Sequence, residues 1–180
     1  MTDLIGAIIW NNTELALSLI PTSDIGYIDN NGGTALLRAC YNNMHDVALA
    51  LIATGKSNPG QVDKYGYTAL ISACSMNMKT VALALIATGQ SRPEHVNKNN
   101  DTAMIWACSR NMSDVAMALI ATGQSKPEHV NNFDNTALSL AIEHNMTEVV
   151  AILNNYDDYI TKLHKANQYD DPNYVMTIDI

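Results

Sequence analysis

The nonapeptide VALALIATG fills residues 47–55 and recurs unchanged at residues 81–89. Residues 115–123 carry it again with one change, as VAMALIATG, so successive copies lie 34 residues apart. A catalytic motif needs to occur only once in a chain, whereas a packing surface must recur in every stacked unit. A fixed period of this length is typical of proteins whose repeats bury their apolar faces against one another. The nonapeptide therefore predicts a repeat architecture.

Each unit contains a first short helix that begins at a threonine. Threonine is a preferred N-cap residue, and the segments after it read ALLRAC, ALISAC, AMIWAC and ALSLAI. We expect these helices to start after Thr34, Thr68, Thr102 and Thr136. Asparagine tolerates the left-handed conformation that ends a helix. The corresponding asparagines are Asn43, Asn77, Asn111 and Asn145.

A second helix is expected from the methionine that follows each asparagine. These methionines are Met44, Met78, Met112 and Met146. In three units the first turn of this helix carries an acid, which suits the positive end of the helix dipole. In the first three units the helix ends at a glycine, as helices commonly do. These glycines are Gly55, Gly89 and Gly123.

These residues resemble the ankyrin repeat. That family has a turn glycine, Thr-Pro-Leu-His at the start of the first helix, paired small residues, a Gly-His corner, Val and Leu in the second helix, and a closing Gly. The matching places in the first unit are Thr34-Ala35-Leu36-Leu37, Ala39-Cys40, Asn43-Met44, Val47, Leu51-Ile52 and Gly55. The resemblance recurs from about residue 29 to residue 154, and its wording is similar to that of ankyrin repeats in giant DNA viruses of amoebae.

The resemblance implies an all-α ankyrin-repeat solenoid of stacked helix-turn-helix units joined by β-turns and loops. Alanine replaces the family's proline, and Leu or Ile replaces the histidine that ties neighbouring turns, which puts the rigidity of the turns in doubt. We expect terminal units that differ from the inner ones. The expected divisions are a degenerate helical cap at 1–28, repeats at 29–62, 63–96, 97–130 and 131–155, and a capping helix with a tail at 156–180.

The composition favours a soluble intracellular protein. Apolar residues make up 47% of the chain and charged residues only 16%, which is too apolar for a disordered chain. The net charge of −8 argues against binding to nucleic acid or to an anionic membrane. No signal peptide is visible, and no segment approaches the ~18 apolar residues of a membrane span. We expect a cytoplasmic location, which for a viral protein means the host cytoplasm.

The residues that could carry chemistry do not form a known site. Cys40, Cys74 and Cys108 occupy equivalent places roughly 10 Å apart, too far for a disulfide, so we expect buried thiols in a reducing compartment. His95 and His129 fall in loops where we expect them to be solvated, a full repeat apart. The TGKS at residues 54–57 lacks the first glycine of a phosphate-binding loop and lies at a helix end. We therefore expect no enzyme activity, cofactor or metal.

The resemblance also implies one concave surface, formed by the turns and by the exposed stripe of each first helix. Helical spacing gives the stripe as Arg38, Tyr41, Asn42, Ser72, Ser75, Met76, Trp106, Ser109, Arg110, Leu140, Glu143 and His144. Arg110 follows Trp106 by four residues, close enough for a cation–π contact. Trp, Tyr and Arg dominate binding hot spots. The predicted partner-binding residues are Trp10, Arg38, Tyr41, Lys64, Tyr65, Tyr67, Met76, Lys98, Trp106, Arg110, Phe133 and His144.

Non-catalytic binding of a protein partner through this surface is the function that the sequence favours. One alternative is a substrate-recruiting adaptor of a larger assembly such as a ubiquitin ligase, with residues 156–180 as its docking element. Another is that Trp106 and Tyr41 pack against neighbouring turns and only stiffen the stack. We expect a monomer, and the uncharged alanines on the backs of the second helices leave weak self-association as the alternative.

Overall fold

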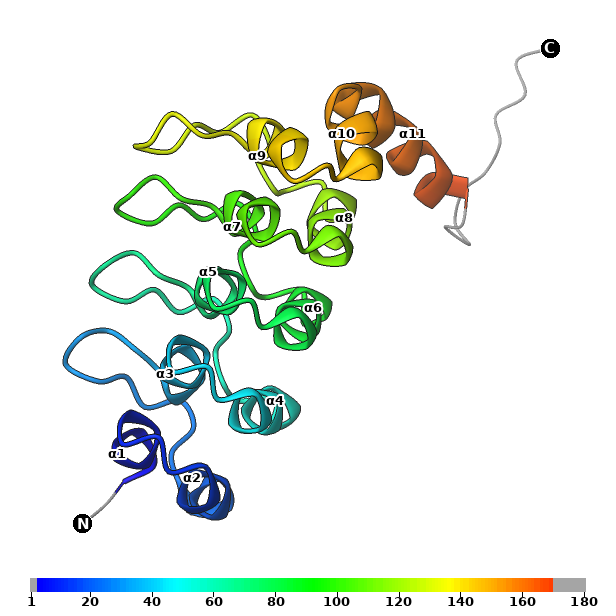
Figure 1. Cartoon of the computed structure of the whole chain (residues 1–180). Helices are drawn as coiled ribbons and strands as arrows, with labels where there is room; N and C mark the ends of the chain where they lie inside the picture. Colours follow the sequence, from blue (N-terminus) through cyan, green and yellow to red (C-terminus); the bar gives the residue numbers. More distant parts are fainter. Residues whose placement is uncertain (1–2, 170–180) are drawn as a thin grey trace.

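The computed structural model describes residues 3–169 and is a row of stacked helix pairs (Figure 1). The helices are α1 (Leu4–Ile9), α2 (Thr13–Leu19), α3 (Ala35–Tyr41), α4 (His45–Ala53), α5 (Ala69–Ser75), α6 (Lys79–Ala87), α7 (Ala103–Ser109), α8 (Ser113–Ala121), α9 (Ala137–Glu143), α10 (Thr147–Leu153) and α11 (Tyr156–Tyr169). A single 3₁₀ turn, Ile20–Thr22, follows α2, and residues 3–169 form no β-strand. The predicted all-α solenoid is confirmed.

Each first helix begins as the threonine pattern predicts. The hydroxyl oxygen of each threonine accepts a hydrogen bond from the amide three residues later, at 3.0–3.3 Å. These threonines are Thr34, Thr68, Thr102 and Thr136. Such an N-cap contributes about 1 kcal/mol. The asparagines predicted after the helices adopt the left-handed conformation, with φ between 53° and 58°.

The nonapeptides form most of the second helices α4, α6 and α8, and part of each nonapeptide faces the core. Their Val and second Leu are fully buried in all three copies, at Val47, Leu51, Val81, Leu85, Val115 and Leu119. First helices pack on first helices and second helices on second helices, so the core runs uninterrupted through the stack. The three cysteines lie in this core as free thiols, as the sequence predicts. The closing glycines have φ of 66–67°.

The turns that project from the first-helix layer share one hydrogen-bonding device (Figure 1). The first residue of each turn is an Asp or Asn whose Oδ1 accepts hydrogen bonds from the amides two and four residues later. These residues are Asp29, Asp63, Asn97 and Asn131. Side-chain acceptors of this kind stabilise a turn without help from a neighbouring strand.

Neighbouring turns are also tied to one another, although the histidine of the family pattern is missing. The amides of Lys64, Lys98 and Asn132 donate to carbonyl oxygens of the preceding turn at 2.8–3.2 Å. Side chains from the loop before each turn add a second link. Nε2 of Gln61 lies 3.0 Å from the Gly32 carbonyl oxygen, and Nε2 of His95 lies 3.1 Å from that of Gly66. These hydrogen bonds link neighbouring turns where the histidine of the family pattern is absent.

The expectation that His95 and His129 are solvated is wrong. Both side chains are half-buried, and Nε2 of His129 is shielded from solvent. Burial lowers the pKa of His95, because the charged imidazolium loses hydration. Nε2 of His95 faces the Gly66 carbonyl oxygen, whereas Nε2 of His129 has no hydrogen-bond partner among the described residues.

The two ends of the stack are closed differently. At the amino end, the helices α1 and α2 form a degenerate pair that packs on α3 and α4. At the other end, Tyr156 and Tyr159 of α11 pack against the core beside α10. Ile142 on α9 remains 57% exposed, so α11 leaves part of the last first helix uncovered (Figure 1). The expected tail at 170–180 lies outside the described residues.

Candidate functional site

The turns and the first helices α3, α5, α7 and α9 share one face of the stack, which we call the groove face. Two adjoining hollows lie on it. The tyrosine hollow, of about 430 Å³, is lined by Arg38, Tyr41, Asp63, Tyr65, Tyr67, Lys98 and Asn99. The tryptophan hollow, of about 350 Å³, is lined by Tyr67, Asn99, Asp101, Ile105, Trp106, Ser109, Asn131, Phe133, Asn135 and Leu140. Tyr67 and Asn99 belong to both and form their common wall.

Arg38 in the tyrosine hollow is held by the acids of two turns. Its Nε lies 2.8 Å from Asp29 Oδ2, and its Nη1 lies 4.0 Å from Asp63 Oδ2. The hydrogen-bonded guanidinium lowers the pKa of Asp29 to about 2, and the carboxylate raises the pKa of Arg38 in return. Only 14% of the Arg38 side chain is exposed. Its positive charge is therefore neutralised within the face.

Two lysines on the groove face keep their charge available. The ammonium of Lys64 lies 2.6 Å from Asn31 Oδ1 and 5.0 Å from the ring centroid of Tyr65. Lys98 is exposed and lines the tyrosine hollow. Neither lysine forms an ion pair within residues 3–169. The rim of the hollow is therefore positively charged.

The tryptophan hollow is lined by both apolar and polar side chains, and the buried Nε1 of Trp106 has no hydrogen-bond partner among the described residues. Trp106 is half-buried and packs against the core, whereas Phe133 from the fourth turn is 71% exposed. The carboxylate of Asp101 is buried and accepts hydrogen bonds from Asn131 at 2.8 Å and Asn97 at 3.4 Å. A hollow of this kind can accept a large side chain without leaving a charge unpaired.

The remaining predicted residues lie at the ends of first helices. The guanidinium of Arg110 lies 5.4 Å from the Trp106 ring, so the predicted cation–π contact is present. Its Nε also donates to the carbonyl oxygen of Ser75 in the preceding repeat, at 2.9 Å. Met76 and His144 hold the equivalent C-cap positions of α5 and α9. Trp10, at the end of α1, is 82% exposed.

The structure thus brings most of the predicted residues together but not all. Arg38, Tyr41, Tyr65, Tyr67, Lys98, Trp106 and Phe133 line the two hollows. Lys64 and Arg110 stack on aromatic rings of the hollows. Trp10, Met76 and His144 lie outside both.

Two positions of the expected exposed stripe are buried. Ser72 is fully buried and Leu140 nearly so. They hold the same place on their helices as Arg38 and Trp106, which are themselves largely or partly buried. This position of the first helix is therefore less exposed than helical spacing predicts.

Sequence reasoning missed the residues that shape the groove face. Asp29, Asp63, Asn97 and Asn131 organise the turns but do not stand out as apolar, aromatic or charged-cluster residues. Their signal is an Asp or Asn that recurs every 34 residues, five residues before each N-cap threonine.

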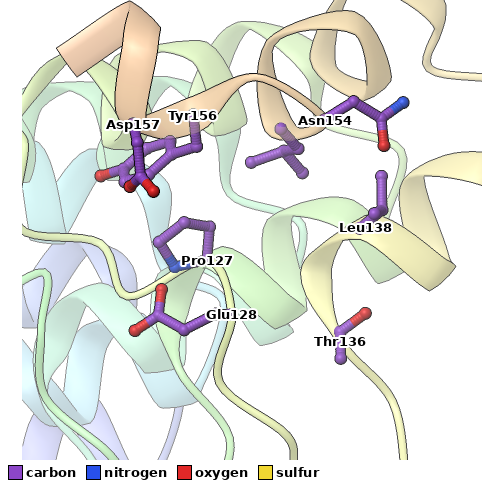
Figure 2. A pocket seen from close by; sticks show the side chains of 8 residues that line it. Pro127, Glu128, Thr136, Leu138, Asn154, Tyr156 and Asp157 are labelled. Carbon is purple, nitrogen blue, oxygen red and sulfur yellow. The ribbon is translucent and has the colours of Figure 1, made fainter. Parts of the chain in front are cut away.

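A larger hollow of about 620 Å³ lies at the carboxyl end, apart from the groove face (Figure 2). It is enclosed by the starts of α9 and α11, the end of α10, and the loop at Pro127. Leu138 and Leu153 line it half-buried, whereas their equivalents Met104 and Leu119 are fully buried by the next repeat. The hollow is therefore the stacking surface of the last repeat, and we assign no chemistry to it.

Residues 3–169 contain no group of three or more His, Cys, Asp or Glu side chains placed to hold a metal ion. Burial raises the pKa of Cys40 and Cys108 to about 12 and raises that of Cys74 as well, which opposes formation of a nucleophilic thiolate. Among the helices of residues 3–169, none combines the length and apolar character that crossing a bilayer requires.

The chain matches a known family of repeats. A family model described as ankyrin repeats (3 copies) matches residues 4–94 and residues 83–166. The two matches together run from α1 into α11. No curated protein matches the chain.

Proposed function

The chain belongs to the ankyrin-repeat family, and from this premise we propose that it binds a partner protein through the groove face. Ankyrin repeats are generally protein–protein interaction modules, and the family is generally non-catalytic. The finer part of the proposal is the location of the binding surface and the residues that form it.

The observation that supports this proposal is the pair of adjoining hollows on the groove face. Five of the eleven aromatic residues of the chain line them: Tyr41, Tyr65, Tyr67, Trp106 and Phe133. Exposed aromatic side chains around a hollow are typical of interface hot spots. The opposite surface of the stack exposes small side chains such as Ala53, Ala87 and Ala121. These side chains provide little contact area for a partner.

The test is partner capture by a double variant, Tyr65→Ala with Phe133→Ala. Both side chains are largely exposed, so their loss should leave the helical circular dichroism signal unchanged. Capture by proximity labelling should fall by at least about tenfold, because hot-spot truncations commonly cost ~2 kcal/mol.

Tyr27→Ala is the matched control for this experiment. Tyr27 is 53% exposed, as is Tyr65, but it lies outside both hollows. The control should retain every partner. Recovery of the same partners by the double variant would contradict the proposal, provided that the variant remains folded.

The adaptor alternative assigns a docking role to residues 156–180, of which 170–180 lie outside the described residues. Within α11, Tyr156 and Tyr159 pack inward against the core, and no described feature of the helix favours docking over capping. The capture experiment still separates the two functions. An adaptor would lose its target in the double variant but keep the proteins that bind residues 156–180.

A cytoplasmic location and a monomeric state complete the proposal. Three buried free thiols suit a reducing compartment. The exposed alanines on the backs of the second helices form a surface with little to bury in a dimer, so any self-association should be weak.

A further inference from the structure

The lysine side of the tyrosine hollow is locally basic, although the chain carries a net charge of −8. Lys64 and Lys98 are exposed there, and Arg38 lines the same hollow. Two carboxylates, those of Asp29 and Asp63, lie close to Arg38 and offset only part of this charge. A local positive surface therefore adjoins the aromatic hollows.

The positive charge is concentrated on one side of the tryptophan hollow. Lys98 lines the tyrosine hollow, and Asn99, the next residue, belongs to the wall that the two hollows share. On the far side, the exposed Asp134 follows Phe133 in the fourth turn. A bound segment that carries carboxylates would be attracted to the lysine side of the hollow and repelled by the other.

The basic groups available on this face are its lysines. Arginine forms two-pronged contacts with carboxylate or phosphate groups. Arg38, however, is occupied by Asp29 and Asp63, and Nε of Arg110 is bound to the Ser75 carbonyl oxygen. Lys64 and Lys98 act as single charges, which pair with the carboxylates of Asp and Glu side chains.

We propose that the partner segment carries an aromatic or large aliphatic anchor with Asp or Glu residues on one side of it. The anchor enters the tryptophan hollow between Trp106 and Phe133, and the carboxylates pair with Lys98 and Lys64. This inference rests on the proposed function, because it names the kind of partner that the same face takes.

Short synthetic peptide pools provide the probe. Each pool has a central Trp or Phe and the same random positions, and the pools differ only in flanking residues, which are Asp and Glu, Asn and Gln, or Lys and Arg. Binding of each pool to the full chain is measured by fluorescence anisotropy. The acidic pool should bind the wild type about three- to tenfold more tightly than the neutral pool, as expected for two exposed ion pairs. This preference should shrink as salt is added.

Two variants with the same loss of charge locate the effect. Lys64→Gln with Lys98→Gln should abolish the preference for the acidic pool over the neutral pool. Lys56→Gln with Lys79→Gln removes two exposed lysines at the ends of second helices and should leave the preference intact. Circular dichroism confirms that each variant is folded.

The outcomes separate this inference from the proposed function. Equal or tighter binding of the neutral or basic pool overturns the acidic partner alone. The same holds if the acidic preference survives in Lys64→Gln with Lys98→Gln. If no pool binds the wild type better than it binds Tyr65→Ala with Phe133→Ala, the groove face is not the binding surface and both proposals fail.

Discussion

At the scale of single residues, Asp29 serves two purposes at once. Its Oδ1 accepts hydrogen bonds from the amides of Asn31 and Gly33 and so shapes the first turn. The same carboxylate pairs with Arg38 at the edge of the tyrosine hollow. Asn97 and Asn131 perform only the first task in the later turns. Asparagine at the equivalent position of later repeats therefore shows that an amide can shape the turn without an ion pair.

The lowered pKa of Asp29 makes part of the stability depend on pH. The ordinary pKa is 3.8 and the folded value is about 2. A carboxyl group whose pKa is lower in the folded state stabilises the fold above its ordinary pKa. The contribution disappears as the pH falls through the folded value. It should be complete above about pH 4 and gone below about pH 2.

The substitution Asp29→Asn isolates this contribution, because asparagine can keep the turn hydrogen bonds. We expect it to lower the free energy of unfolding by about 1 kcal/mol at neutral pH, after allowance for solvent screening. Near pH 2 the variant and the wild type should be equally stable. Urea unfolding at a series of pH values measures the difference. A constant difference over the whole range would exclude the ion pair as its cause.

At the scale of elements, the turns depend on how closely the backbones of neighbouring repeats approach. Gly66 has a φ of +82°, and a Cβ there would lie 2.9 Å from the Cα of Asn97 in the next turn. Gly89, which ends α6, has a φ of +66°, but a Cβ there would have no neighbour within 4 Å. The two glycines share a left-handed backbone and differ in crowding.

Alanine at each of these glycines should separate the two costs. Gly89→Ala should destabilise the protein by about 1 kcal/mol, the cost of a left-handed conformation for a residue with a Cβ. Gly66→Ala should cost about 2–3 kcal/mol, because the second and third turns must also move apart. Chemical denaturation of both variants measures the costs. Equal losses of stability in the two variants would show that the second and third turns can move apart at no measurable cost.

At the scale of the whole molecule, stability in a repeat stack comes from units and the interfaces between neighbours. The inner repeats have a neighbour on each side, whereas the last first helix, α9, is only partly covered. We therefore expect native-state hydrogen exchange to be slowest in α5 and α7 and faster in α9 and α10.

The contact of α11 with the stack can be tested in the same measurement. Tyr156→Ala with Tyr159→Ala removes the side chains of α11 that pack against the core. Exchange should then speed up in α9 and α10, while α1 and α2 at the far end keep their rates, because each repeat contacts only its neighbours. An equal change at both ends would indicate that the molecule opens as a single unit.

The architecture of this protein can be predicted from local signals in its sequence. The 34-residue period, the N-cap threonines, the left-handed asparagines and the closing glycines are local signals, and local signals fix where helices begin and end. The buried Val and Leu of each nonapeptide follow from helical spacing. The cation–π contact between Trp106 and Arg110 was predictable for the same reason, since both lie on one helix face.

Tertiary packing determines which of the surface residues a partner can reach. Acids from two turns neutralise Arg38, Ser72 and Leu140 are buried, and Trp10 lies outside the hollows. His95 lies against the Gly66 carbonyl oxygen of the preceding turn. Several of these outcomes depend on contacts between residues of neighbouring repeats. The period of a sequence shows that repeats stack, but the side chains that meet across each interface are set by the packing of one unit on the next.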